Sequence, residues 1–159
     1  MGVEQAIAAD TDELVELRIA YLTEDNGALD PSDEVAIRAG LPGYFRTHLG
    51  HDLHVYVVRD GGRIATCAFL LVVEKPMSPA FMSGRTGIVL NVYTRPDCRR
   101  RGNARRVMEA LLADVRGLGL SVVELQATDD GYPLYRSVGF LDDESKYHRM
   151  KWFDRPCRP

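Results

Sequence analysis

The chain has few of the residues that define several protein classes. Its three cysteines (Cys67, Cys98 and Cys157) are odd in number and far apart. This spacing excludes a disulfide framework and a zinc cluster of cysteines, and it predicts a reducing, cytoplasmic location. No apolar run approaches the roughly 20 residues that a membrane-spanning helix needs. The first residues have no basic region and no long apolar stretch, so no secretory signal is expected there.

Lysine is also scarce, at 3 residues against 17 arginines, a bias typical of a GC-rich bacterial genome. The formal net charge is −3, which disfavours a general nucleic-acid-binding protein, because such proteins usually carry a basic surplus. The charges are nevertheless separated along the chain. Residues 95–106 are rich in arginine, and residues 24–34 hold five carboxylates and no basic residue. This separation predicts binding partners of different charge.

The remaining composition predicts one folded domain, residues 1–159, because 45% of the residues are apolar and 27% are charged. Apolar periodicity and turn residues give the expected elements. Strands are expected at 3–8, 54–59, 63–73, 86–94 and 121–127, with a final hairpin at 140–153; helices are expected at 11–22, at 33–49 with an interruption at 40–43, at 104–118 and at 132–138. This order predicts an α/β (α+β) fold in which helices pack on a mixed sheet.

The turn between the strand at 86–94 and the helix at 104–118 carries the strongest chemical signal. It is rich in arginine, it contains Gly102, and it leads directly into a helix N-terminus. The free N–H groups of a helix N-terminus bind phosphate, and glycine allows a ligand to approach the backbone closely. These residues therefore predict a phosphate site, and the alternative is a solvated basic turn.

Two short motifs resemble those of one family. Residues 99–104, RRRGNA, match the [Q/R]-x-x-G-x-[G/A] loop of the GNAT superfamily of N-acetyltransferases, and residues 134–140, LYRSVGF, resemble its LYxxxGF signature. The resemblance implies a mixed, mostly antiparallel sheet of six to seven strands flanked by about four helices. It also implies acetyl-CoA, or another acyl-CoA, as the co-substrate that donates the acyl group, without a metal.

The same resemblance implies roles for individual residues. The residues expected around the CoA pyrophosphate are Arg99, Arg100, Arg101, Gly102, Asn103, Ala104 and Arg105. Pantetheine is expected to pair with the backbone of Val92, Tyr93 and Thr94. The Val92 amide would stabilise the oxyanion, and Tyr135 would protonate the leaving thiolate. From the residue type alone, an aromatic packing role is favoured for Tyr135.

The sequence lacks the general base that is common in the family. Many relatives carry a glutamate on the strand before the loop, where this chain has Ile88, and residues 86–94 contain no carboxylate. Glu74, Glu24 and Asp25 are the candidates for this role, each of which is otherwise a surface acid. The remaining alternative is an amine that arrives already neutral.

Other polar and aromatic residues give weaker signals. His48, His51 and His54 lie three residues apart, but Gly50 breaks a common helix, so loop histidines are favoured over a metal site. Tyr147 and Trp152 are expected in the core or in the contact of a homodimer.

These observations together predict an enzyme that transfers an acetyl group from acetyl-CoA to a primary amine. The acidic segment 24–34 is typical of a cleft that attracts a cationic acceptor, and the alternative is a solvated loop whose acids cap the second helix. A degenerate acyl-CoA-binding domain and, less favoured by the net charge, a nucleic-acid-binding module are the alternatives.

Overall fold

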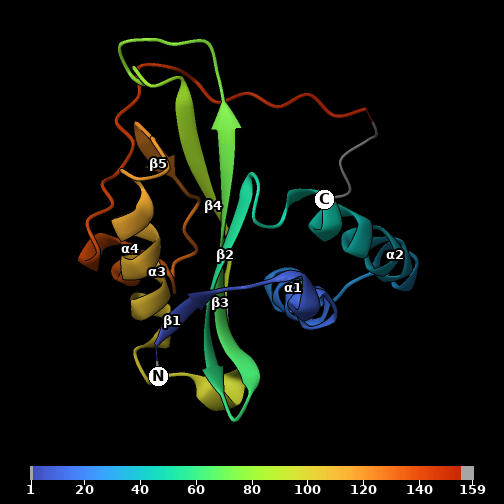
Figure 1. Ribbon diagram of the computed structural model, residues 1–159. Coiled ribbons are helices and arrows are strands. Elements are labelled where there is room, and N and C mark those ends of the chain that lie inside the picture. The colour runs from blue at the N-terminus through green and yellow to red at the C-terminus, as the bar shows by residue number, and fades with distance from the viewer. Residues whose placement is uncertain (1, 155–159) are drawn as a thin grey trace.

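The computed structural model describes residues 2–154, which form one open sheet with helices on both faces (Figure 1). The strands are β1 (Val3–Gln5), β2 (Leu53–Asp60), β3 (Arg63–Glu74), β4 (Arg85–Thr94) and β5 (Val122–Glu124). They lie in the order β1-β2-β3-β4-β5, and every neighbouring pair is antiparallel except β4 and β5. The predicted mixed, mostly antiparallel sheet is thus confirmed.

Four α-helices cover the sheet. They are α1 (Thr11–Asn26), α2 (Pro31–His48), α3 (Asn103–Asp114) and α4 (Tyr132–Ser137), and the short 3-10 turns η1 (Ala8–Asp10) and η2 (Pro96–Cys98) precede α1 and α3. Helices α1 and α2 lie on one face of the sheet, and α3 and α4 lie on the other (Figure 1). In the chain, strands β2, β3 and β4 lie between the helices of one face and those of the other.

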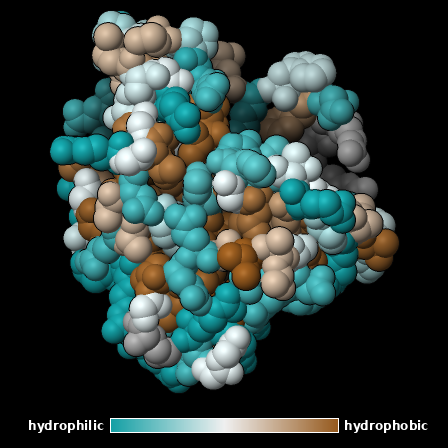
Figure 2. All heavy atoms as spheres, viewed as in Figure 1, coloured by the Kyte–Doolittle hydropathy of each residue, from teal (hydrophilic) through white to brown (hydrophobic). Residues whose placement is uncertain are grey.

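Each face has its own apolar core. On one face, Leu14 and Leu17 of α1 pack with buried residues of β2 and β3, including Val55. On the other face, Val107 and Leu111 of α3 pack against the opposite side of the same strands. The surface visible in Figure 2 has its apolar residues dispersed among hydrophilic ones, as expected when the apolar side chains of each helix face the sheet.

The two N-terminal helices differ from their predicted bounds. Helix α1 continues to Asn26 and ends at Gly27, whose φ of 75° is a left-handed value that glycine adopts without strain. The carboxylates at 24 and 25 therefore lie on a helix and not in the predicted loop. The predicted interruption of the second helix is also wrong, since α2 continues through Pro42. The buried Phe45 packs edge-on against Phe69 of β3 at 5.9 Å and holds this part of α2 in place.

The strands expected at 54–59 and 63–73 form the β2–β3 hairpin. Gly61 and Gly62 have φ values of 60° and 85°, the pair of positive angles that a type I′ turn requires. Asp60 and Arg63 form the last pair of the ladder. The turn residues thus fix the pairing at this end of the β2–β3 ladder.

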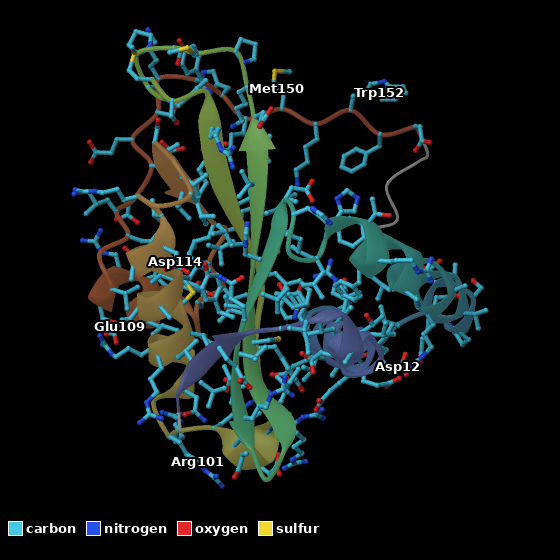
Figure 3. All side chains as sticks on the ribbon, viewed as in Figure 1. Asp12, Arg101, Glu109, Asp114, Met150 and Trp152 are labelled. Atoms are coloured by element: carbon cyan, nitrogen blue, oxygen red, sulfur yellow. The ribbon has the colours of Figure 1, made fainter. Side chains whose placement is uncertain are left out.

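Residues 2–154 contribute five strands to the sheet, fewer than the predicted six to seven. Strand β5 is shorter than predicted, and the hairpin expected at 140–153 is not formed. This segment has three acidic residues at 142–144, which disfavour strands, and Asp142 accepts hydrogen bonds of 3.0 Å from the Tyr132 hydroxyl. Tyr147 and Trp152 are 74% and 86% exposed, so the predicted core role is wrong for both (Figure 3 labels Trp152).

No helix within residues 2–154 combines the length and apolarity needed to cross a membrane. Cys67 and Cys98 are free and buried, and Cys157 lies outside the described residues.

Candidate active site

Strand β4 has an open edge next to β5. Its parallel pairing with β5 covers only Thr86–Ile88, although β4 continues to Thr94. No described strand pairs with this edge of β4 beyond Ile88. The pairing of β4 with β3 on its other side is also irregular. Phe69 pairs with Leu90, and Cys67 pairs with Tyr93. Asn91 and Val92 therefore lie opposite a single residue of β3 and form a β-bulge. The open edge and the bulge make backbone groups of β4 available to a ligand.

Asn91 holds the bulge in its unusual conformation. Its φ is 49°, a left-handed value that asparagine tolerates better than most residues, and its side chain is buried. Its Oδ1 accepts a hydrogen bond of 3.1 Å from Arg18 Nη1 of α1, and its Nδ2 lies 3.5 Å from Cys67 Sγ. Burial raises the pKa of the Cys67 thiol to about 12, so this sulfur is an inert packing group.

The turn after β4 ends at the predicted phosphate site. Gly102 is the N-cap residue of α3 with a φ of 74°, and no side chain caps the helix. A Cβ placed at Gly102 would meet no atom within 4 Å, so its outer side is open. The first N–H groups of α3 thus lack the side-chain acceptor that usually satisfies them, and a pyrophosphate fits this arrangement.

The arginines of this turn divide into two groups. Arg99 binds both oxygens of Glu24 at 2.8 and 2.6 Å, and its Nε donates to the Thr94 carbonyl at 3.0 Å. Arg101 donates to Asp60 at 2.9 Å. Arg100, with a φ of 62°, forms no ion pair or side-chain hydrogen bond with any described residue.

Further residues around the turn are also in place. Arg105 donates to the Ser137 hydroxyl at 2.8 Å, so it links α3 to α4. The Asn103 side chain is buried, and neither its Nδ2 nor its Oδ1 has a partner among the described residues. Ala104 follows with a small side chain, which leaves the helix N-terminus accessible. Figure 3 shows Arg101 at the end of the molecule where this turn lies.

A cleft of about 770 Å³ lies along the open part of β4. It brings together Val92 and Tyr135, which the sequence predicted for the catalytic site from positions more than forty residues apart. Helix α1 contributes Arg18, Tyr21 and Asp25 to its wall. The segment after α4 contributes further polar residues, so the cleft has a mixed charge.

Tyr135 is positioned by packing. Its ring lies edge-on to Phe140 at 6.1 Å, and its hydroxyl forms no hydrogen bond with any described residue. Burial, and secondarily the neighbouring Tyr21, raises the pKa of Tyr135 to about 12. The phenol is therefore protonated at neutral pH and has its proton available to a ligand.

The candidate bases differ in whether they line the cleft. Glu74 is exposed at the end of β3, 3.6 Å from Arg85, and is not among the residues that line the cleft. Glu24 is held by Arg99 and does not line the cleft either, whereas Asp25 does. The cleft also contains Glu124 of β5, which sequence reasoning missed. Only the strand pairing, which places Glu124 beside Ile88, could have identified it.

The histidines take part in local contacts. His48 Nδ1 lies 2.7 Å from Asp52 Oδ1, and His54 Nδ1 lies 3.4 Å from Gln5 Oε1. Among residues 2–154, no group of three potential metal ligands is close enough to hold an ion.

The comparisons with known proteins agree with this geometry. Residues 12–140 match the acetyltransferase (GNAT) family. A predicted acetyltransferase of Clostridium acetobutylicum, solved with acetyl-CoA, is 23% identical, with a TM-score of 0.81 over 94% of this chain and 95% of that one. A GCN5-related N-acetyltransferase of Ralstonia eutropha JMP134 is 23% identical, with a TM-score of 0.74 over 93% of this chain and 97% of that one.

A curated relative matches a shorter stretch. It is the chloroplastic serotonin N-acetyltransferase 2 of Oryza sativa subsp. japonica, 36% identical over 66 residues, which are 42% of this chain and a third (33%) of that protein. The solved structures share the fold, and the family match covers most of the chain. On this basis, the protein belongs to the GNAT family of acetyltransferases.

Proposed function

We propose that this acetyltransferase moves the acetyl group of acetyl-CoA to a primary amine, which attacks the thioester directly. The proposal rests on one observation: the open edge of β4 and Tyr135 line the same cleft. Acyl transfer needs an oxyanion donor and an acid for the leaving group, and this cleft contains a candidate for each.

The donor is acetyl-CoA. Its pyrophosphate binds at the N-terminus of α3, where Gly102 is open on its outer side and Arg100 is unpaired among the described residues. Arg99, Arg101, Asn103, Ala104 and Arg105 surround this position. The pantetheine arm then runs along the open edge of β4 and pairs with the backbone of Val92, Tyr93 and Thr94. The acetyl-CoA in the Clostridium acetobutylicum structure supports this choice of donor.

Two groups of this chain act on the thioester. The Val92 N–H stabilises the negative charge that develops on the carbonyl oxygen when the amine attacks. The Tyr135 hydroxyl donates its proton to the departing sulfur. Its raised pKa keeps it protonated across the physiological range, which suits an acid and excludes it as the base.

The acceptor is a cationic amine before it reacts. Asp25 lines the cleft and attracts such a group, whereas Glu24 is neutralised by Arg99. The five carboxylates of residues 24–34 predicted a cationic acceptor. In the structure, the attraction for a cation comes from Asp25 and from the other acids of the cleft. Residues Tyr147 and Trp152 are exposed and remain candidates for a contact between two copies.

The test is a thiol-release assay with acetyl-CoA and a panel of primary amines, with serotonin and spermidine included. We expect CoA release that depends on one class of amine, and a rise in melting temperature on adding CoA. Tight CoA binding without release for any amine would instead support a degenerate acyl-CoA-binding domain.

A further inference from the structure

Amine acetylation requires a group that removes a proton from the acceptor, and the cleft contains three carboxylates that can do so. They are Asp25 on α1, Glu124 on β5 and Asp143 in the segment after α4. Asp143 is ion-paired with Arg149 at 2.8 Å. One Asp143 oxygen is thus already occupied by a guanidinium at hydrogen-bond distance, so the choice falls on Asp25 and Glu124.

Glu124 is fixed by the sheet. It is the Cα partner of Ile88 in the parallel β4–β5 ladder, and both residues line the cleft. A Cβ at Gly87 would meet Leu70 and Leu120 on the α3 side, so Ile88 projects to the α1 side. Residues in register on adjacent strands project to the same face, which places Glu124 on the α1 side as well.

The Glu124 carboxylate also has its oxygens available. Lys75 Nζ is 3.9 Å from Oε2, which is longer than a hydrogen bond, and no described residue donates a hydrogen bond to this carboxylate. Two cavities meet here, and the residues that line both are Glu124, Leu125, Tyr135, Asp143 and Arg149. A carboxylate with free acceptor capacity thus lies at the same junction as the proposed acid.

We propose that Glu124 is the general base that deprotonates the acceptor ammonium. This inference rests on the proposed function. Asp25 is exposed on the last turn of α1, next to the Glu24 that contacts Arg99, so it lies toward the CoA turn. Glu124 lies beside Ile88, at the far end of the open edge, where an amine can enter without meeting the CoA chain.

The protons and electrons balance with these two residues. Glu124 takes one proton from R–NH₃⁺, directly or through one water, and the freed lone pair forms the C–N bond. The C–S bond then breaks, and the sulfur leaves with its electron pair and takes the proton of Tyr135. The second proton of the nitrogen returns to the Tyr135 oxygen through solvent. The products are the amide, CoA thiol and one proton, which Glu124 releases to water.

The test compares E124Q with the wild-type enzyme, using the amine of the panel that wild type acetylates fastest. At pH 7 we expect kcat/KM to fall by about 10²-fold, the lower range for a lost general base. The loss should shrink as pH rises toward the pKa of the amine, because a growing fraction of the amine is then already neutral. E124D should recover part of the rate, since it keeps the carboxylate.

Other titratable and charged groups near Glu124 can also affect the pH dependence of the rate. Those that line the cleft are Arg18, Tyr21 and Asp25 from α1, Tyr135 from α4, and Asp143, Tyr147 and Arg149 after α4. Lys75, just after β3, lies 3.9 Å from Glu124 without lining the cleft. D25N and E74Q are therefore measured in parallel as the competing candidates. E4Q is the charge-matched control, since Glu4 is exposed on β1 and pairs with Arg59 far from the cleft.

The possible results are distinct. An E124Q loss that disappears at high pH, with unchanged CoA-induced stabilisation, supports the proposal. An E124Q enzyme with wild-type rates, or with a higher KM alone at every pH, would overturn it, as would a pH-dependent loss in D25N or E74Q but not in E124Q. Wild-type protein that releases no CoA with any amine would instead overturn the proposed function.

Discussion

The donor side and the acceptor side of the cleft are built in different ways. The proposed donor site is a continuous stretch, residues 92–105, in which backbone groups and one glycine would bind CoA. The acceptor side is assembled from side chains on α1, β5 and the segment after α4. A short contiguous motif can specify the first, whereas only tertiary structure can specify the second. The donor chemistry is therefore shared by a family, and the acceptor chemistry is set by each chain.

The largest expected effect comes from Tyr135, which lies where the two sides meet. Tyr135→Phe keeps the ring that packs against Phe140 and removes only the hydroxyl. We expect kcat to fall by about 10²-fold, as for the loss of a general acid, with little change in CoA affinity. Steady-state kinetics with the best acceptor measures this. An unchanged kcat would make Tyr135 a packing residue.

The same residue makes a prediction about pH. The acid must be protonated, and its pKa of about 12 keeps it so throughout the range in which the enzyme can be assayed. Titration of Tyr135 should therefore cause no fall in wild-type kcat between about pH 8 and 10, since a fall requires pH near the pKa. A fall in that range that is absent from Tyr135→Phe would show that the phenol titrates lower than its burial indicates.

The next largest effect tests the donor side alone. Gly102→Val places a β-branched side chain at a φ of 74° and fills the open space where pyrophosphate is proposed to bind. We expect CoA affinity to fall by about tenfold or more, equivalent to about 1.4 kcal/mol. The measurement is the CoA-induced rise in melting temperature.

A matched control separates this effect from backbone strain. Gly50 has a φ of 79° and, like Gly102, nothing within 4 Å of an added Cβ, but it follows α2 on the other side of the sheet. Gly50→Val should lose stability to a similar degree and keep the full CoA-induced shift. If both variants, or neither, lose the shift, the turn at 99–105 is not the pyrophosphate site.

A smaller effect is expected from a glycine that supports Tyr135. A Cβ at Gly131 would lie 2.9 Å from Tyr135 Cε2, so Gly131→Ala must displace the ring. We expect kcat to fall by about 3- to 10-fold while CoA binding is retained, because misplacement of a reacting group slows the chemical step. Gly117→Ala, whose Cβ would meet only Asp114 O at 3.5 Å, should leave kcat unchanged. Equal kcat values in both variants would contradict a positioning role for Gly131.

The sequence predicted the fold class and the strand–turn–helix unit of β4 and α3 because both depend on local patterns. Periodicity identified most of the strands and helices, and the Asp60-Gly61 step is typical of a hairpin turn such as that between β2 and β3. The sequence did not predict Glu124, because its position beside Ile88 depends on a parallel pairing between distant segments. The end of α1 was missed because acidic residues and Gly27 indicated a loop, although a helix can continue to a glycine. The final hairpin was overpredicted from aromatic residues that the structure leaves exposed.

The smallest expected effect tests where the proposed donor and acceptor sites meet, at the ion pair between Glu24 of α1 and Arg99 of the turn before α3. Asp25 is the next residue of α1, yet it lines the cleft where Glu24 does not. Asp25→Asn should raise the KM of a cationic acceptor by about 2- to 5-fold, the size of one partly solvated charge interaction.

Glu24→Gln is the matched variant, because it removes the neighbouring charge from the same turn of the same helix. It should leave the acceptor KM almost unchanged and alter CoA affinity instead, since it frees Arg99. The Asp25→Asn effect should also shrink at high salt, where screening shortens the reach of an exposed charge. If Glu24→Gln raises the acceptor KM as much as Asp25→Asn does, both carboxylates attract the acceptor. The boundary between the proposed donor and acceptor sites would then not lie between these two residues.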